Sequence, residues 1–388
     1  MSYEKSLALL HQVASPNGFL ASAEATTNYK RVWARDGVIC GLAALASGDD
    51  QLIQCFRATL ETLAANQHAV GTIPSNVACN AQGNEVSYGG LAGRVDAQTW
   101  FIIGVCQYAY AQQDPDFFAH YLPHIEKALA LLTAWEFNNK QLVYVPLSGN
   151  WADEYLTDGY VLYDQLLRVW ALRCCHYFTG NTEQEAKYKA ICEQIQVNFF
   201  PNSQGEKFHP RAYAEFGFQG FVPCSFSPSG YKTPFDAFAN SLLVMLDLAP
   251  ETLNQSILDY GIDLAQATSM GLLPAFWPPV FETDDYWSLL KNNCKYEFRN
   301  HPYEFHNAGS WPMVNGFFGC ALLSKNKTQA AQALLEHIHQ ANAVQEYSFF
   351  ENFNTQTAEP NGVAYCAWSA AAAVLLHQRL TSNFNLLL

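Results

Sequence analysis

Apolar segments with helical spacing recur from one end of the chain to the other, whereas the alternating runs typical of strands are scarce. This pattern predicts about twelve helices, because each segment repeats its apolar residues every three to four positions. The predicted helices lie near residues 4–13, 36–48, 50–67, 96–111, 115–136, 160–179, 182–199, 235–247, 251–267, 310–324, 326–341 and 363–379.

These helices are of two kinds. Six are rich in Ala, Gly, Leu and Trp and poor in charge, so we expect them to be buried on most sides. They begin near Asp36, Asp96, Tyr160, Phe235, Ser310 and Val363. The helices beside them, such as 50–67 and 182–199, each have one polar face. An inner ring of helices wrapped by an outer ring explains this alternation.

The spacing of the buried helices distinguishes two architectures. They begin roughly 55–75 residues apart, so each unit is a helix pair with a long loop, and such pairs build either an open solenoid or a closed barrel. The long loops rich in Gly, Pro and aromatic residues favour an all-α (α/α)6 barrel with its loops gathered over one mouth. No linker or shift in composition divides the sequence, which predicts a single domain over residues 1–388.

Composition and charge exclude several classes of protein. The 388 residues include 35 acidic and 21 basic side chains, and aromatic residues make up 14%. Disordered chains have few aromatic residues, and nucleic-acid binders need clustered Lys and Arg. The longest apolar runs, such as 370–376, are far shorter than the roughly 20 residues that span a bilayer. We therefore expect a folded protein with neither a nucleic-acid nor a membrane partner.

The cysteines and the start of the chain bear on its compartment. Residues 1–18 show no basic segment followed by an apolar core, so we expect no secretory signal. The 11 cysteines are scattered without C-x-x-C pairs, which is typical of reduced thiols in a cytoplasmic protein. We expect no metal site and no cofactor.

In such a barrel, the loops that enter the inner helices converge on one cavity, so the polar residues before each helix are the candidates for function. Trp33, Arg35 and Asp36 precede the first buried helix, and Asp96 precedes the second. Each acid could serve only to cap its helix, with Arg35 paired to a neighbouring acid. A tryptophan face beside an arginine and a carboxylate also suits a sugar.

The loop before the third buried helix is the most acidic. It contains Asp153, Glu154 and Asp158, together with Trp151 and Tyr155. An acid against aromatic rings loses solvation, which raises its pKa and suits it to donate a proton near neutral pH. A solvated acidic loop is the alternative interpretation.

The loop before the fifth buried helix holds His301, His306, Asn307 and Trp311. Two histidines five residues apart do not share one helix face as the histidines of H-E-x-x-H do, so this segment is a weak candidate for a metal site. Hydrogen bonding to hydroxyl groups fits these side chains better.

The last loop leads into the sixth buried helix and carries Glu351, with Glu346 and Glu359 as the other local acids. Five loops at one end of the predicted barrel thus place acids or amides beside aromatic rings. Hydrolysis of a glycosidic bond needs two carboxyl groups that flank the bond, and this layout supplies candidates for both. The sequence contains no nucleophile elbow, P-loop or dinucleotide fingerprint.

Five segments also show a family resemblance. In the order WARDG, GRVDAQTW, WADEY, YEFHNAGSWP and FFENFN, they resemble inverting glycoside hydrolases with an (α/α)6 barrel, above all the neutral/alkaline invertase family. The resemblance spans residues 28–376, and the stretch from His306 to Pro312 is its most specific piece. Processing α-glucosidases, glycogen-debranching enzymes and mannosylglycerate hydrolases share weaker versions of these patterns.

The resemblance implies an inverting O-glycosyl hydrolase that acts on a small α-linked sugar, such as an α-glucoside or a sucrose-like compound. In matching positions, Asp153 would be the general acid and Glu351 the general base. Substrate-binding residues would be Trp33, Arg35, Asp36, Asp96, His306, Asn307 and Trp311, and the acidic loop adds Trp151 and Tyr155 as candidates.

One departure from the family leaves alternatives open. The invertases carry I-D-R-R-M-G around the acid, where this chain has W-A-D-E-Y, so sucrose specificity is in doubt and Glu154 and Asp158 are rival acids. A sugar epimerase or lyase on the same barrel would use His301 or His306 instead. A non-catalytic sugar-binding barrel is a third interpretation. The sequence leaves the sugar, its linkage and a homo-oligomer open.

Overall fold

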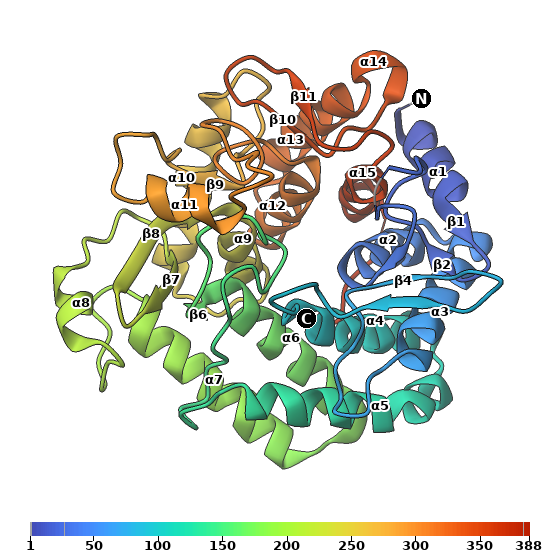
Figure 1. Cartoon of the computed structure of the whole chain (residues 1–388), viewed down its shortest axis with the longest axis horizontal. Helices are drawn as coiled ribbons and strands as arrows, with labels where there is room; N and C mark the ends of the chain where they lie inside the picture. Colours follow the sequence, from blue (N-terminus) through green and yellow to red (C-terminus); the bar gives the residue numbers. More distant parts are fainter. Residues whose placement is uncertain (1, 27, 383) are drawn as a thin grey trace.

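The computed structural model describes residues 2–26, 28–382 and 384–388, and its helices form a ring (Figure 1). The inner helices are α2 (Ala34–Ser47), α4 (Asp96–Gln112), α6 (Leu162–Thr179), α9 (Ala237–Met245), α12 (Pro312–Ser324) and α15 (Ala367–Thr381). Each contacts the next along the chain, and α15 contacts α2. The ring is therefore closed, which confirms the predicted (α/α)6 barrel over the open solenoid.

A second layer of helices surrounds this ring. The outer helices are α1 (Ser2–Val13), α3 (Asp50–Ala65), α5 (Pro115–Ala134), α7 (Thr182–Phe199), α10 (Glu251–Gln266) and α13 (Thr328–Asn342). Five of them pack on the inner helix that precedes them, whereas α1 packs on α15 (Figure 1). The first helix in the sequence thus completes the last pair.

Burial explains why the two layers differ in composition. Every residue of α4 from Asp96 to Ala109 is buried, whereas α3 buries one stripe that includes Phe56 and Leu60 and exposes the opposite face. A helix enclosed on all sides must be apolar all round, and a helix with a wet face needs only one apolar stripe. The sequence pattern reflects this geometry directly.

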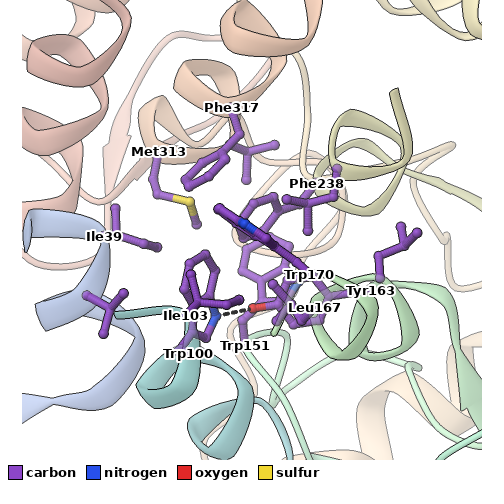
Figure 2. Packing of buried hydrophobic residues seen from close by; sticks show 14 of the residues in the cluster. Ile39, Trp100, Ile103, Trp151, Tyr163, Leu167, Trp170, Phe238, Met313 and Phe317 are labelled. Atoms are coloured by element: carbon purple, nitrogen blue, oxygen red, sulfur yellow. Dashed lines mark hydrogen bonds between the residues drawn. The ribbon is translucent and has the colours of Figure 1, made fainter. Parts of the chain in front are cut away.

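Large aromatic side chains fill the centre of the ring (Figure 2). Trp100 of α4 lies edge-on to Trp170 of α6 and to Phe317 of α12, with ring centroids 6.0 and 6.2 Å apart. Its indole Nε1 donates a hydrogen bond of 2.8 Å to Tyr163 Oη, so the one polar group of this buried ring is satisfied. These contacts join helices from three sides of the ring.

The inner helices begin without side-chain caps, except for α9, among those that the structure describes. Carbonyl groups of other loops bind some of their first N–H groups instead. Ala34 N donates to Ser75 O, and Ala367 N donates to Ala21 O, at 3.0 and 2.9 Å. Since the first N–H groups of a helix have no partner inside it, these bonds tie neighbouring loops together around the mouth.

Short strands add to these ties. One antiparallel sheet has the order β6 (Tyr160–Val161), β7 (Pro223–Ser227), β8 (Gly230–Asp236) and β9 (Phe276–Trp277). A second joins β3 (Val32–Trp33), β4 (Asn76–Ala78) and β5 (Glu85–Ser87), and two hairpins pair β1 (Ala14–Ser15) with β2 (Gly18–Phe19) and β10 (Asn352–Phe353) with β11 (Pro360–Asn361). Three short helices complete the loops: α8 (Pro210–Glu215), α11 (Trp287–Asn293) and α14 (Val344–Tyr347).

The strands also explain where the predicted boundaries differ from the observed ones. We predicted inner helices from Tyr160 and Phe235, but both residues pair in the four-stranded sheet, and the helices begin two residues later. Most strands have only two or three residues, which is too short for an alternating pattern to appear.

Two further observations concern the compartment. Within the part of the chain that the structure describes, no helix is both long and apolar enough to cross a bilayer. All eleven cysteines are free thiols, and eight of them are buried.

The contact between α2 and α3 gives a test of the packing. A Cβ added at Gly41 would overlap the ring of Phe56, whereas one added at Gly217 would meet nothing within 4 Å. We expect Gly41→Ala to lower the free energy of unfolding by about 1–3 kcal/mol. Gly217→Ala should change it by less than about 0.5 kcal/mol. Urea unfolding of both variants checks this, and equal stabilities would show that the two helices are not packed as described.

Candidate active site

A cavity of about 880 Å³ opens among the loops that enter the inner helices. Its lining side chains come from residues 28–36, 151–154 and 296–311, together with Glu351 and Trp368. These segments precede α2, α6, α12 and α15 or lie in the first turns of α2 and α15. The loops before α4 and α9 contribute no lining side chain among the described residues. Four of the five segments selected from the sequence therefore meet at one cavity.

Most of the predicted site residues line this cavity. They are Trp33, Arg35, Asp36, Trp151, Asp153, His306, Trp311 and Glu351. Three others lie behind its wall. Asn307 binds the backbone of Val280 through both ends of its amide, at 2.7 and 2.9 Å. The ring of Tyr155 stacks on Phe276, and Asp96 accepts a hydrogen bond of 3.0 Å from Arg35 Nη1. These three side chains thus support the wall.

Arg35 is the centre of a buried charge cluster. Its guanidinium lies 3.0 Å from Asp96, 3.7 Å from Asp36 and above the ring of Trp368. The pairing of Arg35 with neighbouring acids is the structural role considered from the sequence. Asp36, however, does not cap its helix, because α2 has Trp33 at the N-cap position and no side-chain cap.

The Asp36 carboxyl group is available to a ligand. Burial raises its pKa to about 6, although Arg35 opposes this shift. Its Oδ2 atom is buried and has no hydrogen-bond partner among the described residues. A hydroxyl group of a ligand would supply the missing hydrogen bond.

Other unpartnered polar atoms surround the same cavity. Within the described part of the chain, they include Arg35 Nε, Trp151 Nε1, Trp368 Nε1 and both ring nitrogens of His306. Most buried polar groups in folded proteins have a hydrogen-bond partner, so a cluster of exceptions needs an explanation. Water or the hydroxyl groups of a bound molecule would supply the missing hydrogen bonds.

His306 is held between two aromatic rings. It stacks on Trp311 with centroids 4.9 Å apart and meets Trp151 edge-on at 5.1 Å. Burial lowers its pKa to about 4, so the imidazole is neutral at pH 7. A neutral imidazole has one donor and one acceptor nitrogen, which suits a hydroxyl group.

The three acids of the loop before α6 have different surroundings. Asp153 Oδ2 accepts a hydrogen bond of 2.6 Å from Arg94, and its side chain is 35% exposed. Glu154 also lines the cavity, but both of its carboxylate oxygens bind the Arg299 guanidinium. Asp158 forms an ion pair with Lys232 and does not line the cavity.

Glu351 and Asp36 are the two most deeply buried carboxyl groups of the cavity. The Oε1 atom of Glu351 accepts a hydrogen bond of 2.8 Å from Tyr29 Oη. Burial raises the pKa of Glu351 to about 7, while the bond from Tyr29 and the charge of Arg299 act in the opposite direction. The carboxyl group can therefore exchange a proton near neutral pH.

Several lining residues were missed in the sequence. Tyr29 and Trp368 lie inside segments already selected, so their aromatic character was the available signal. Arg299 lies in the selected histidine segment, but its ion-pair partner Glu154 is 145 residues away, so no local pattern reveals the pair. Tyr296 lies outside every selected segment.

No group of three or more His, Cys, Asp or Glu side chains in the described residues is arranged to hold a metal ion. The sequence-based expectation that the site needs neither a metal nor a cofactor stays a prediction.

The pKa of Glu351 gives a test in stability. Since folding raises this pKa from 4.5 to about 7, the ionised carboxylate costs stability as the pH rises from 4.5 to 7, and the cost is absent below that range. As the pH rises from 5 to 8, the free energy of unfolding of Glu351→Gln should therefore increase by about 2–3 kcal/mol relative to that of the wild type.

Urea unfolding at several pH values measures this difference. Glu359→Gln, which changes an exposed acid of the same loop, should show no such trend. A gain that does not depend on pH would mean that the carboxylate is not buried as described.

Comparison with known proteins gives one matching family and several solved structures with the same fold. Residues 217–383 match the family of alkaline and neutral invertases. No curated protein matches the sequence. The matched stretch contains the loops that carry His306 and Glu351, which are the late segments of the predicted resemblance.

Solved structures share the barrel. A GH63 mannosylglycerate hydrolase from Thermus thermophilus has a TM-score of 0.69 at 12% identity and covers 97% of this chain and 99% of its own. A GH78 rhamnosidase of Bacillus sp. GL1 has a TM-score of 0.65 at 15% identity, over 97% of this chain and 34% of its own. A bacterial glucoamylase with bound acarbose has a TM-score of 0.64 at 16% identity, over 98% and 55%.

At these low identities, the TM-scores show a common fold and no more. The family match bears out the resemblance over the C-terminal part of the chain and supports the predicted class of enzyme, a glycoside hydrolase. Residues 217–383 thus resemble the alkaline and neutral invertases, on a barrel that several glycoside hydrolases share.

Proposed function

We propose that this chain is a glycoside hydrolase that cleaves a small α-linked sugar with inversion, using Asp153 as the general acid and Glu351 as the general base. The observation that carries the proposal is that both carboxyl groups line one cavity. Their loops lead into α6 and α15, which lie three places apart in the ring of six and therefore face each other (Figure 1). A substrate between them would have one carboxyl group on each side.

This placement fits the chemistry of inversion. Asp153 would protonate the glycosidic oxygen while Glu351 removes a proton from the water that attacks the opposite face of the anomeric carbon. We expect the two carboxyl groups to lie about 6.5–9.5 Å apart, which leaves room for that water. Arg94 binds Oδ2 of Asp153, and Oδ1 has no hydrogen bond to the described residues. That oxygen is free to face the leaving group.

Tyr29 and Arg299 support the role of Glu351 as the general base. A base must be ionised when the water attacks, and burial alone disfavours the charge of Glu351. The hydrogen bond from Tyr29 and the positive charge of Arg299 both favour the ionised form. These two residues thus keep part of the carboxyl group ionised near neutral pH, while burial keeps the carboxylate basic enough to accept a proton.

The remaining walls fit a sugar ring. Trp151, Trp311 and Trp368 supply aromatic faces, and Asp36 and His306 supply unpartnered polar atoms. The volume of about 880 Å³ lies in the range of about 300–1,000 Å³ that is usual for small-molecule sites. We therefore propose a short saccharide rather than a polymer as the substrate.

We also propose that the enzyme acts in the cytoplasm on a free carbohydrate, with no nucleic-acid or membrane partner and no cofactor. The free thiols support a reducing compartment, since disulfide bonds are rare there.

Amide substitutions test the catalytic pair. Asp153→Asn and Glu351→Gln should each lower kcat by about 10²–10⁴, because each removes one proton transfer. Thermal unfolding should show that both variants stay folded. Glu154→Gln serves as the control for the rival acid and should lower kcat by less than about 10-fold. Full activity of Asp153→Asn with loss in Glu154→Gln would transfer the acid role to Glu154.

The stereochemistry of the product tests the mechanism separately. A panel of α-linked disaccharides and glycosyl-glycerates, followed by proton NMR from the first turnover, should release the β-anomer of the sugar before mutarotation. The panel also identifies the substrate. First release of the α-anomer would contradict inversion and require the carboxyl groups to lie about 5–5.5 Å apart instead.

A further inference from the structure

One loop segment borders the cavity, and most of it lies outside the segments selected from the sequence. Residues 294–299 follow α11, and four consecutive side chains of this segment, from Tyr296 to Arg299, line the cavity. Tyr296 is nevertheless 92% exposed. An aromatic ring that borders a cavity and is covered by almost nothing is a candidate contact for a ligand.

Both ends of this segment are fastened to the loop of Asp153. At one end, Asn293 Nδ2 donates a hydrogen bond of 3.1 Å to Tyr155 O, and Asn293 Oδ1 accepts one of 2.9 Å from Ser148 Oγ. At the other end, Asn300 Nδ2 donates to Glu154 O at 3.1 Å. The first part of the segment and the proposed acid therefore form one side of the cavity, whereas Arg299 at its end also acts on Glu351.

The proposed reaction determines which part of the substrate this side of the cavity contacts. The general acid protonates the oxygen that leaves, and the general base works on the opposite face of the anomeric carbon. The residues beside Asp153 consequently border the leaving group rather than the sugar whose anomeric carbon is attacked. Tyr296 is thus on the leaving-group side.

The surroundings of Tyr296 differ from those of Phe298, the other aromatic residue of the segment. Phe298 meets Trp287 edge-on, with centroids 5.4 Å apart. For Tyr296, the described contact is Lys295 Nζ, 5.8 Å from the ring centroid. Its face is open to an apolar surface, and a pyranose or furanose ring has such a surface where its C–H bonds point to one side.

The charges of the cavity restrict what this second ring carries. Each arginine that lines the cavity in the described structure already has an acidic partner: Arg31 binds Glu85, Arg35 binds Asp96, and Arg299 binds Glu154. Two more lining acids, Glu297 and Glu351, have no arginine ion pair among the described residues. Among the lining charges, a phosphate or carboxylate on the leaving group would meet these acids and no unpaired guanidinium, and Lys295, whose ammonium lies near the Tyr296 ring, does not line the cavity.

We propose that Tyr296 is the platform of the leaving-group subsite, on which an uncharged second sugar ring stacks. This inference rests on the proposed function, because the position of Asp153 defines which side receives the leaving group. It makes Tyr296 a residue for specificity, which binds substrate but takes no part in proton transfer.

Binding measurements in the Glu351→Gln background test the platform without turnover. The probes are trehalose, sucrose and α-1,2-mannobiose, compared with methyl α-D-glucopyranoside and methyl α-D-mannopyranoside, which lack a second ring. Calorimetry identifies which of these disaccharides binds. Tyr296→Ala should weaken binding of that disaccharide about 5–10-fold, because a stacking contact is lost. The Kd of the methyl glycoside should stay within about two-fold.

Two further variants serve as matched controls. Tyr296→Phe keeps the ring and should bind the disaccharide like the parent. Tyr177→Ala removes a tyrosine that is 59% exposed but does not line this cavity, and it should change neither Kd. A loss that is equal for disaccharide and methyl glycoside, or no loss at all, would overturn the platform.

The remaining outcomes separate this inference from the proposed function. Selective weakening by Tyr296→Ala, in a protein whose wild type hydrolyses none of these sugars, would keep the platform and reject the hydrolase. Hydrolysis of a disaccharide with the same kcat/KM in wild type and Tyr296→Ala would keep the hydrolase and reject the platform. No binding of any probe would overturn both.

The charge of the leaving group is tested with sucrose and sucrose 6′-phosphate, whose phosphate lies on the fructosyl ring. The phosphate should weaken binding at least about 5-fold, because it meets the unpaired lining acids, and tighter binding of the phosphorylated sugar would overturn the uncharged ring.

Discussion

Enclosure of the six inner helices is the constraint on which the rest of the structure depends. A helix surrounded by other helices cannot hydrate a charge along its length, so its charged groups must lie at its ends or be paired. Asp36 and Asp96 accordingly lie in the first turns of α2 and α4, with Arg35 between them. The closed ring thus concentrates polar chemistry at one mouth, where the loops can build a site.

The fold was predictable from the sequence because enclosure leaves a strong trace in composition. Twelve helices in two alternating kinds follow from periodicity alone, whereas β6 and β9 are too short to leave a pattern. Within the site, the sequence indicates which loops meet. It does not separate His306, which faces the cavity, from Asn307, whose amide holds the backbone of Val280. That difference depends on the direction of neighbouring side chains, which only the folded loop sets.

Burial has opposite effects on stability and function in this cavity. Removing Glu351 from water raises the free energy of its charged form, and the same removal makes the carboxylate a stronger base. Tyr29 and Arg299 compensate for part of the cost without neutralising the group. Unpartnered buried atoms on Asp36, Trp151 and His306 carry a similar cost. A ligand that satisfies them would stabilise the fold as it binds.

The pairing of α1 with α15 has a consequence for synthesis of the chain. The ribosome releases α1 first, yet the helix that covers its apolar face emerges more than 350 residues later. Until then, the ring lacks its closing member, and the cavity lacks Glu351 and Trp368. Local helix pairs can form early, because their contacts are close in sequence. During synthesis, ring closure and completion of the cavity therefore both wait for the segment from Glu351 to α15.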